Sequence, residues 1–342
     1  MKNLLPYFFG ILLLVSGCAK KLDKEDDAPE PVAFETPAGW PQPLYDFAAN
    51  PLTKQGIALG RKLFYDGQLS RDGQFPCASC HQQAAAFGTH DHDLSHGFDN
   101  SHTLRNAPPL QNLAWQSDFH RDGGILNLDL QPLAPITALN EMAETIDNVL
   151  NKLRNDPAYP AMFKAAFGSE DITTKRMTQA LSQFMLTMVS ANSRYDQMKR
   201  GEITFTLPEQ LGYDIFQQKC AACHAEPLFT DNSFRNTGLP MDAVLQDAGR
   251  MRITQSSNDS LKFRVPSLRN VMKTRYYGHD GRFFDILNVF DHYKNGVQKG
   301  PTTDPLIANG IPLSNYEIGQ VTAFLMTLTD DAFIQNQALS MP

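Results

Sequence analysis

The sequence CASCH at residues 77–81 decides the fold of this chain, and it recurs as CAACH at residues 220–224. In a CxxCH sequence the two thiols can each add to one vinyl group of a single haem, and the histidine that follows is delivered to the iron as an axial ligand. The two copies therefore predict two covalently bound haem c groups. The predicted attachment and iron-ligand residues are Cys77, Cys80, His81, Cys220, Cys223 and His224.

A CxxC pair alone is also compatible with a redox dithiol or with half of a zinc site. Here a histidine follows both pairs, and no βαβ pattern typical of thioredoxin surrounds either of them. These two observations favour haem over the dithiol and the zinc site.

Four short signals recur in the same order around the two motifs. An apolar pattern of helical spacing precedes each motif, with Leu59-Gly60 and then Leu63-Phe64 in the first case and Leu211-Gly212 and then Ile215-Phe216 in the second. The later signals are PPLQN at 108–112 and PSLRN at 266–270, then His120 just ahead of Asp-Gly at 122–123 and His279 directly before Asp-Gly at 280–281. Because four matches occur in register, the sequence predicts a duplicated one-haem unit.

The secondary structure is predicted to be mainly α-helical. Capping-box patterns at 206–209 and 314–317 predict two helix starts, and another helix is predicted from Ala180 to Val189. The His-, Gly-, Asn- and Pro-rich stretch from 87 to 112 has no sustained period and predicts a long loop. The predicted fold is therefore mainly α, with two cytochrome c-like haem domains that are related by duplication, face each other and carry long loops.

The N-terminal segment predicts export. Its apolar run is too short for an ordinary membrane span and ends in the lipobox-like LVSGC, so residues 1–17 are predicted to be a lipoprotein-type signal peptide and Cys18 the acylated residue. An uncleaved anchor helix with a chance cysteine is the alternative. Residues 18–37 are charged and contain proline, which predicts a flexible tether. We expect the N-terminal haem domain at 38–200, the C-terminal haem domain at 201–342, and the protein on the periplasmic side or at the cell surface, with the outer membrane favoured.

Length and charge narrow the class of protein further. With 342 residues and 42% hydrophobic composition, the chain is long enough for about two domains without help from disulfides. The formal net charge of −7 argues against nucleic acid as the main partner, because binding phosphates requires a basic face.

Beyond both haem motifs, several segments resemble the bacterial dihaem cytochrome c peroxidase family, which includes the MauG-type enzymes that modify tryptophan. These segments are RNAP at 105–108, Gln131 to Met142 and Phe263 to Tyr293, and the resemblance runs from about Pro51 to Leu328. It implies an N-terminal peroxidatic haem that reduces hydrogen peroxide to water and a C-terminal haem that takes electrons from a small cytochrome or another donor. It also implies a calcium ion between the domains and a frequent homodimer.

The resemblance names the groups that would act on peroxide. Splitting the O–O bond requires a base that takes a proton from one oxygen and returns it to the other. Glu141 matches the distal glutamate of the family, and Gln131 matches a distal glutamine. Because Glu144 follows at helical spacing, an ordinary exposed helix carboxylate is the alternative interpretation of Glu141.

Peroxide also requires an open iron position opposite His81. In the family a histidine of the following loop often blocks this position. An alignment without gaps places Phe98 there, which predicts an open site. A shift of two residues would instead place His96 there as an iron ligand, and the remaining histidines of the loop are interpreted as solvent-exposed.

Two further positions depart from the peroxidases of the family. Most members have a tryptophan directly before the first Asp-Gly, where this chain has Arg121, and the nearby Trp115 fits a core position better. Tyr293 stands where peroxidases commonly use methionine as the second ligand of the C-terminal haem, and MauG-type proteins have tyrosine there. The stripe Phe283, Ile286, Leu287, Phe290 and Tyr293 directs Tyr293 inward and turns His292 roughly 100° away. A core tyrosine without a metal contact is the alternative.

The resemblance places the calcium ligands at Asn106, through its side chain, and at the backbone carbonyls of Thr274 and Tyr276, the last normally a proline. Oxygen ligands suit this hard cation.

The leading prediction is thus an exported, lipid-anchored dihaem peroxidase. The alternatives are a MauG-like enzyme that uses peroxide to oxidise a residue of a partner protein, and a non-enzymatic two-haem electron carrier. The carrier would be favoured if His96 were an iron ligand, because both irons would then be six-coordinate.

Overall fold

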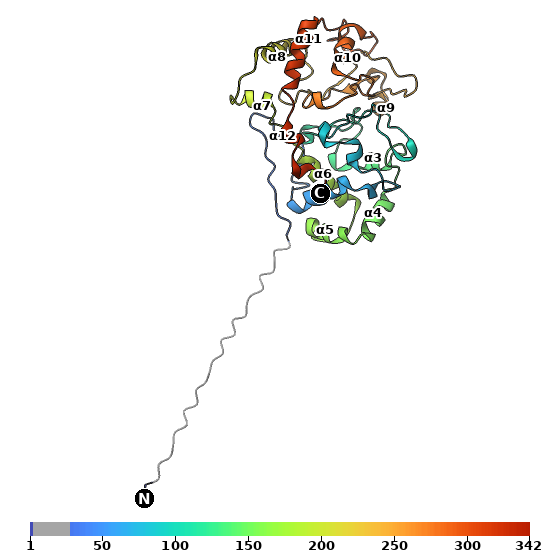
Figure 1. Ribbon diagram of the computed structural model, residues 1–342. Coiled ribbons are helices and arrows are strands. Elements are labelled where there is room, and N and C mark those ends of the chain that lie inside the picture. The colour runs from blue at the N-terminus through green and yellow to red at the C-terminus, as the bar shows by residue number, and fades with distance from the viewer. Residues whose placement is uncertain (3–27) are drawn as a thin grey trace.

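The computed structural model describes residues 1–2 and 28–342, so Cys18 and all but the first two residues of the predicted signal peptide lie outside the described residues. Short helices joined by long loops make up most of the chain, which confirms the mainly α prediction (Figure 1). A single two-stranded ladder pairs β1 (Phe234–Arg235) with β2 (Phe263–Arg264) in antiparallel fashion in the described part. The α-helices are α1 Lys54–Tyr65, α2 Cys77–Cys80, α3 Leu133–Thr137, α4 Ile146–Asn155, α5 Ala158–Phe167, α6 Thr174–Leu186, α7 Arg194–Lys199, α8 Leu207–Lys219, α9 Met251–Thr254, α10 Ile286–Asp291, α11 Asn315–Met326 and α12 Asp331–Ile334.

Each half of the molecule is built on one pair of closely packed helices. A Cβ atom at Gly60 on α1 would lie 1.9 Å from the carbonyl oxygen of Ala180 on α6. In the same way, a Cβ atom at Gly212 on α8 would lie 2.0 Å from the carbonyl oxygen of Gln320 on α11. Only glycine permits backbones to approach so closely. The two Leu-Gly signals of the sequence therefore mark equivalent helix contacts.

Two of the three predicted helix starts agree with the structure. Both capping boxes form, with Thr206 and Glu209 at the start of α8 and Ser314 and Glu317 at the start of α11. The helix predicted from Ala180 to Val189 is α6, which ends at Leu186 and begins earlier, at Thr174, because the Thr173 hydroxyl caps the free backbone N–H of Arg176. From residue 87 to 112 the chain is a long loop, as predicted.

Two hydrophobic cores underlie the two halves. The first contains Leu59, Phe64 and Phe184, and the second contains Phe216 and Phe324. The residues of the two cores do not separate at residue 200, where the domain boundary was expected. Tyr195 belongs to the second core, whereas Phe333 and Leu339, from the end of the chain, belong to the first. The C-terminal residues therefore return to the N-terminal half (Figure 1).

Polar groups with little or no exposure join the halves. Gln111 donates from Nε2 to the carbonyl oxygen of Arg269 at 2.5 Å, and Asn270 donates from Nδ2 to Gln111 and to the Ser190 hydroxyl. Asn112 and Asn270 adopt the left-handed conformation at the equivalent place of each half, with φ of 59° and 58°. The recurring Gln-Asn and Arg-Asn pairs thus lie at the contact between the halves.

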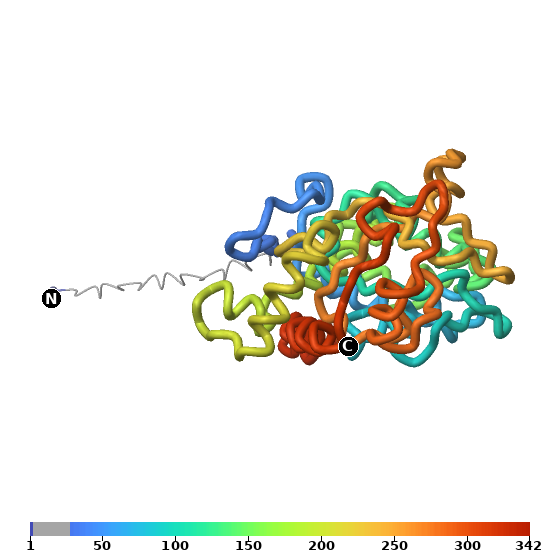
Figure 2. Tube along the Cα trace, turned by 90° about the horizontal axis from the view of Figure 1, so that it is seen from above, coloured from blue at the N-terminus to red at the C-terminus, as the bar shows by residue number. Residues whose placement is uncertain are grey.

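The segment before α1 also connects the halves. It runs along the outside of the molecule, in blue (Figure 2). The Trp40 ring packs on Trp115 of the N-terminal half with ring centroids 4.8 Å apart, and the Arg269 guanidinium lies 4.5 Å from a Trp40 ring centroid. Within the part of the chain that is described, no helix is long and apolar enough to cross a membrane.

Candidate functional site

The first CxxCH sequence forms one helical turn, α2, and His81 follows it directly. His81 Nδ1 lies 2.8 Å from the carbonyl oxygen of Phe87. Because a carbonyl can only accept, Nδ1 carries the proton and the Nε2 lone pair is left for a metal. Burial lowers the pKa of His81, which keeps the imidazole neutral. This is the protonation state that an iron ligand requires.

The second motif repeats this arrangement. His224 Nδ1 lies 3.1 Å from the carbonyl oxygen of Phe229, and burial lowers the pKa of His224 as well. The bond to a phenylalanine carbonyl just after the motif therefore fixes the same tautomer twice. Sequence reasoning missed both phenylalanines, although each lies five or six residues after its histidine.

The cysteines do not have the properties of the two rival sites. Cys77, Cys80, Cys220 and Cys223 are free in the structure. Burial raises the pKa of Cys77 and of Cys220 to about 12, whereas the attacking thiol of a redox dithiol has a depressed pKa. No group of three or more His, Cys, Asp or Glu side chains that could hold a metal ion occurs among the described residues.

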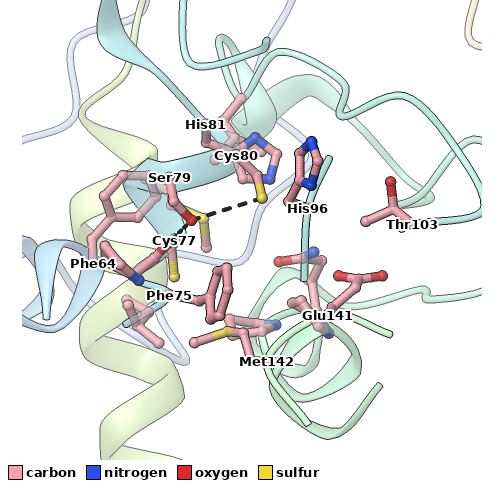
Figure 3. A pocket seen from close by; sticks show the side chains of 17 residues that line it. Phe64, Phe75, Cys77, Ser79, Cys80, His81, His96, Thr103, Glu141 and Met142 are labelled. Atoms are coloured by element: carbon pink, nitrogen blue, oxygen red, sulfur yellow. Dashed lines mark hydrogen bonds between the residues drawn. The ribbon is translucent and has the colours of Figure 1, made fainter. Parts of the chain in front are cut away.

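A cavity of about 610 Å³ adjoins the first motif, and a smaller space of about 60 Å³ continues it. Cys80, His81, Gln131 and Glu141 line both spaces, and Figure 3 shows the cysteine thiols and His81 facing the same space as Glu141. The rest of the smaller space is mainly apolar, with side chains such as Phe64, Leu110, Met142, Leu181 and Met185. Thiols, a neutral imidazole and apolar walls at one cavity fit a covalently held haem.

Glu141 and Glu144 have different surroundings. The Glu141 side chain faces the cavity, and burial there raises the pKa of its carboxyl. Glu144 is buried behind it, where it accepts hydrogen bonds from the backbone N–H of Thr145, from Asn148 and from Lys152. Glu144 thus has a structural role, because it binds polar groups at the start of α4. Of the two carboxylates, only Glu141 faces the cavity, where it can contact a ligand.

Of the two loop registers, the structure places His96 rather than Phe98 on the cavity wall. The Phe98 ring lies under the Arg71 guanidinium, 5.1 Å away, and its backbone N–H donates to the carbonyl oxygen of Glu141 at 2.8 Å. The exposed His96 ring lies between His92 and His102, edge-on to the first and tilted to the second, with ring centroids 4.5 Å apart in each case. These ring contacts hold His96 on the cavity wall.

Cationic side chains line the cavity on the side toward the C-terminal half, and sequence reasoning did not single them out as a group. They are Arg105, Arg121, Arg252 and Arg264, and His120, whose pKa is lowered by burial, lines the same side. Arg105 is neutralised by Asp122 and Asp247, but burial lowers the pKa of Arg121 and of Arg264 to about 10. Arg264 Nε and His120 Nε2 are buried without a hydrogen-bond partner among the described residues. Such a wall suits an anionic group, as a haem carboxylate would be.

Tyr293 lies beside the second motif. It belongs to a π-helical turn, His292–Gly296, that continues α10, and such turns are frequent at functional sites. Burial, followed by the nearby Cys220 and Cys223 thiols, raises the pKa of Tyr293 to about 12. His292 instead turns away, with Nε2 2.9 Å from the carbonyl oxygen of Thr237. The phenol of Tyr293 is therefore near the place where the second haem would be attached.

The residues expected to hold calcium are engaged by other groups. Asn106 Oδ1 accepts a hydrogen bond from Arg121 at 2.9 Å, and the carbonyl oxygen of Thr274 accepts one from the Tyr277 hydroxyl at 2.8 Å. Tyr276, where the family has proline, has a φ of +59° that proline cannot adopt. The residues present therefore do not fit a calcium site of the expected kind.

Trp115 lies in the first core, 2% exposed, and its indole N–H donates to the carbonyl oxygen of Pro41 at 2.8 Å. It lines neither of the two spaces at the first motif. Its predicted core position is thus what the structure shows.

Comparison with known proteins agrees with the site geometry. Residues 54–204 match the family model described as di-haem cytochrome c peroxidase. The methylamine utilization protein MauG of Methylorubrum extorquens is 35% identical over 311 residues, which cover 89% of this chain and 86% of that protein. The cytochrome c551 peroxidase of Nitrosomonas europaea is 31% identical over 288 residues, 83% of each chain.

Among solved structures, a MauG-like protein associated with microbial copper homeostasis superposes with a TM-score of 0.81. It is 32% identical and covers 91% of this chain and 99% of its own. Together with two CxxCH sites whose histidines present the same nitrogen to a metal, these likenesses show that the chain belongs to the di-haem cytochrome c peroxidase family, a family of haem c oxidoreductases.

Proposed function

We propose that this protein reduces hydrogen peroxide to water at the haem held by Cys77, Cys80 and His81, with electrons that arrive from an external donor through the haem held by His224. When bound, the first haem supplies the iron that takes up peroxide and delivers electrons to it. Glu141 takes a proton from one peroxide oxygen and returns it to the other, which leaves as water. Gln131, on the same wall, orients the two oxygens.

The observation that carries this proposal is the position of Glu141. Its carboxyl lines both the large cavity and the smaller space together with His81 and Cys80, and burial raises its pKa, which makes it a stronger base when it is ionised. The proposal requires an iron position that is open to peroxide, so His96, which lies on the wall of the same cavity, must not be an iron ligand.

The test is steady-state peroxide reduction by the two-haem protein with a chemical electron donor, in wild type and in Glu141→Gln. Loss of general acid–base catalysis is expected to lower kcat by roughly 10²- to 10⁴-fold. Glu144→Gln is the matched control, because it changes a neighbouring carboxylate that closes α4 and faces no cavity. It should lower the free energy of unfolding by about 2 kcal/mol and leave turnover in place. Equal turnover in wild type and Glu141→Gln would remove Glu141 from the mechanism.

A second function, peroxide-dependent oxidation of a residue on a partner protein, is favoured by one observation. Tyr293, rather than a methionine, lies beside Cys220 and Cys223, and the relatives include proteins named MauG. An anionic tyrosine oxygen stabilises ferric iron and lowers the reduction potential, which makes the second haem a poor high-potential electron store. Peroxide added to the purified protein together with candidate partners from its own organism, followed by peptide mass spectrometry, would identify a modified partner. If peroxide is consumed and no partner residue changes, this function is excluded in favour of the first.

We further propose that the two halves are haem domains related by duplication. The support is the equivalent placement of Gly60 with Gly212, of Asn112 with Asn270 and of the two histidine–phenylalanine bonds. A haem on the second motif alone in a His81→Ala variant would show that each half binds its cofactor separately.

The proposed location is outside the cytoplasm, with the protein anchored by lipid at Cys18, and a homodimer is the proposed assembly. A Cys18→Ser variant should move the haem-containing protein from the membrane fraction to the soluble fraction. A wild-type protein that is already soluble would exclude the anchor, and sedimentation of the soluble variant would distinguish a dimer from a monomer.

A further inference from the structure

The Arg121 guanidinium occupies an unusual position for a cation. Its Nε donates to the backbone carbonyl of Asn106 and its Nη2 to the Asn106 side-chain oxygen, each at 2.9 Å. The backbone N–H of Asn106 in turn donates to the carbonyl oxygen of His279 in the C-terminal half. One asparagine therefore joins this guanidinium to the contact between the halves.

No carboxylate neutralises Arg121 in the described part of the chain. The acidic groups nearby are already paired, Asp122 and Asp247 with Arg105 and Arg252, and Asp280 with Arg282. Arg121 lines the large cavity at the first haem site together with Arg264, which has no paired carboxylate either. The protein thus keeps an uncompensated positive charge where the N-terminal haem faces the C-terminal half.

That charge lies at the place expected for calcium. The Asn106 side-chain oxygen that would bind the ion is 2.9 Å from Arg121, and the Thr274 carbonyl that would be its second ligand is engaged by the Tyr277 hydroxyl. Calcium requires six to eight oxygen ligands, and a guanidinium on a shared oxygen would hold two cations within about 5 Å of each other. The oxygen atoms of Asn106 and Thr274 therefore leave room for one cation only, and that cation is the Arg121 guanidinium.

We propose that the Arg121 guanidinium replaces the calcium ion of this family as the fixed cation between the halves, and that it acts as the counter-charge of the anionic carboxylate groups of the haem held at His81. The proposal rests on that haem but not on its reaction with peroxide. Its tests use metal content and reduction potential, so its failure is distinguishable from failure of the peroxidase proposal.

The first test uses the wild-type two-haem protein. After passage over a desalting column, atomic emission should find no stoichiometric calcium relative to haem iron. Addition of EGTA or of calcium chloride should leave the optical and paramagnetic resonance spectra unchanged. Stoichiometric calcium, or a spectrum that changes on chelation, would overturn the proposal. This measurement does not depend on any variant being able to fold.

The second test asks whether the charge of Arg121 matters. Arg121→Gln should shift the reduction potential of the haem at His81 downward, because removal of a nearby positive charge stabilises the more positive oxidised state. Arg121→Lys, which keeps the charge, should retain most of the wild-type potential. A potential that does not move in Arg121→Gln, or that falls equally in both variants, would contradict the proposal.

Arg154→Gln is a matched control for this test. The Arg154 guanidinium likewise donates to a backbone carbonyl, that of Ile172, and to an asparagine side-chain oxygen, that of Asn151, but it lies on the exposed face of α4. Its loss should leave both haem potentials in place. An equal shift in Arg154→Gln would show that the effect of Arg121 is not local, and would also refute the proposal.

Discussion

The environment of the Glu141 carboxyl predicts how the activity depends on pH. Burial in an apolar cavity disfavours its charged form and raises its pKa. As the base for peroxide it acts only when ionised, so kcat/KM should fall as the pH is lowered through this raised pKa. This fall in kcat/KM should occur at a higher pH than it would for a glutamate with an ordinary pKa. If the same fall remains in Glu141→Gln, it is caused by the titration of another group.

Tyr293 carries a second prediction at the level of one residue. Tyr293→Met should raise the midpoint potential of the C-terminal haem, because a thioether ligand favours the reduced iron and a phenolate favours the oxidised iron. Tyr293→Phe should leave that iron without the ligand and add a high-spin ferric signal. Spectroelectrochemistry and electron paramagnetic resonance measure both changes. Identical spectra in wild type and Tyr293→Phe would mean that Tyr293 is a core residue.

At the scale of the helices, close packing of α8 against α11 fixes the position of the second motif. Gly212→Ala would place a Cβ atom 2.0 Å from the Gln320 carbonyl and is expected to cost about 1–3 kcal/mol or more in the free energy of unfolding. Gly319→Ala on α11 is the control, because no atom lies within 4 Å of the added carbon and alanine is the better helix former by about 1 kcal/mol. Denaturant unfolding of the two-haem protein should therefore give a lower free energy of unfolding for Gly212→Ala but not for Gly319→Ala.

Helices could be predicted from the sequence where the residues that cause them lie a few positions apart. The capping boxes at Thr206 and Ser314 follow from residues a few positions apart, and they were predictable. The close contacts of Gly60 with Ala180 and of Gly212 with Gln320 join distant parts of the chain, and no local pattern predicted them. The ring contacts of His96 with His92 and His102, which put His96 rather than Phe98 at the cavity, depend on side chains that meet only after the loop has folded.

The same limit applies to the site. The haem motifs were readable because their chemistry needs a fixed short spacing. The cavity position of Glu141 came from the family resemblance, and the role of Glu144 became clear only from its contacts with Asn148 and Lys152. The position of Arg121 between Asn106 and the cavity involves residues from separate loops, so no local pattern could have revealed it.

At the scale of the whole molecule, the contact between the halves depends on buried amides. Asn270 is fully buried, bonds to Gln111 and Ser190, and accepts from the backbone N–H of Asp330 at 2.7 Å. Asn270→Ala leaves these partners unsatisfied and places alanine at a φ of +58°. We expect a loss of about 2–4 kcal/mol in the free energy of unfolding, measured with guanidinium. Wild-type stability in this variant would mean that the amide network does not hold the halves together.

The central claim is that both CxxCH sequences bind haem covalently and that His81 and His224 coordinate the two irons. Mass spectrometry of proteolytic peptides from the mature protein tests it most directly. The expected result is one haem on the peptide that contains Cys77 and Cys80 and one on the peptide that contains Cys220 and Cys223, in equal amounts. Either peptide carrying unmodified cysteines, in a preparation exported through a haem-attachment pathway, would contradict the claim.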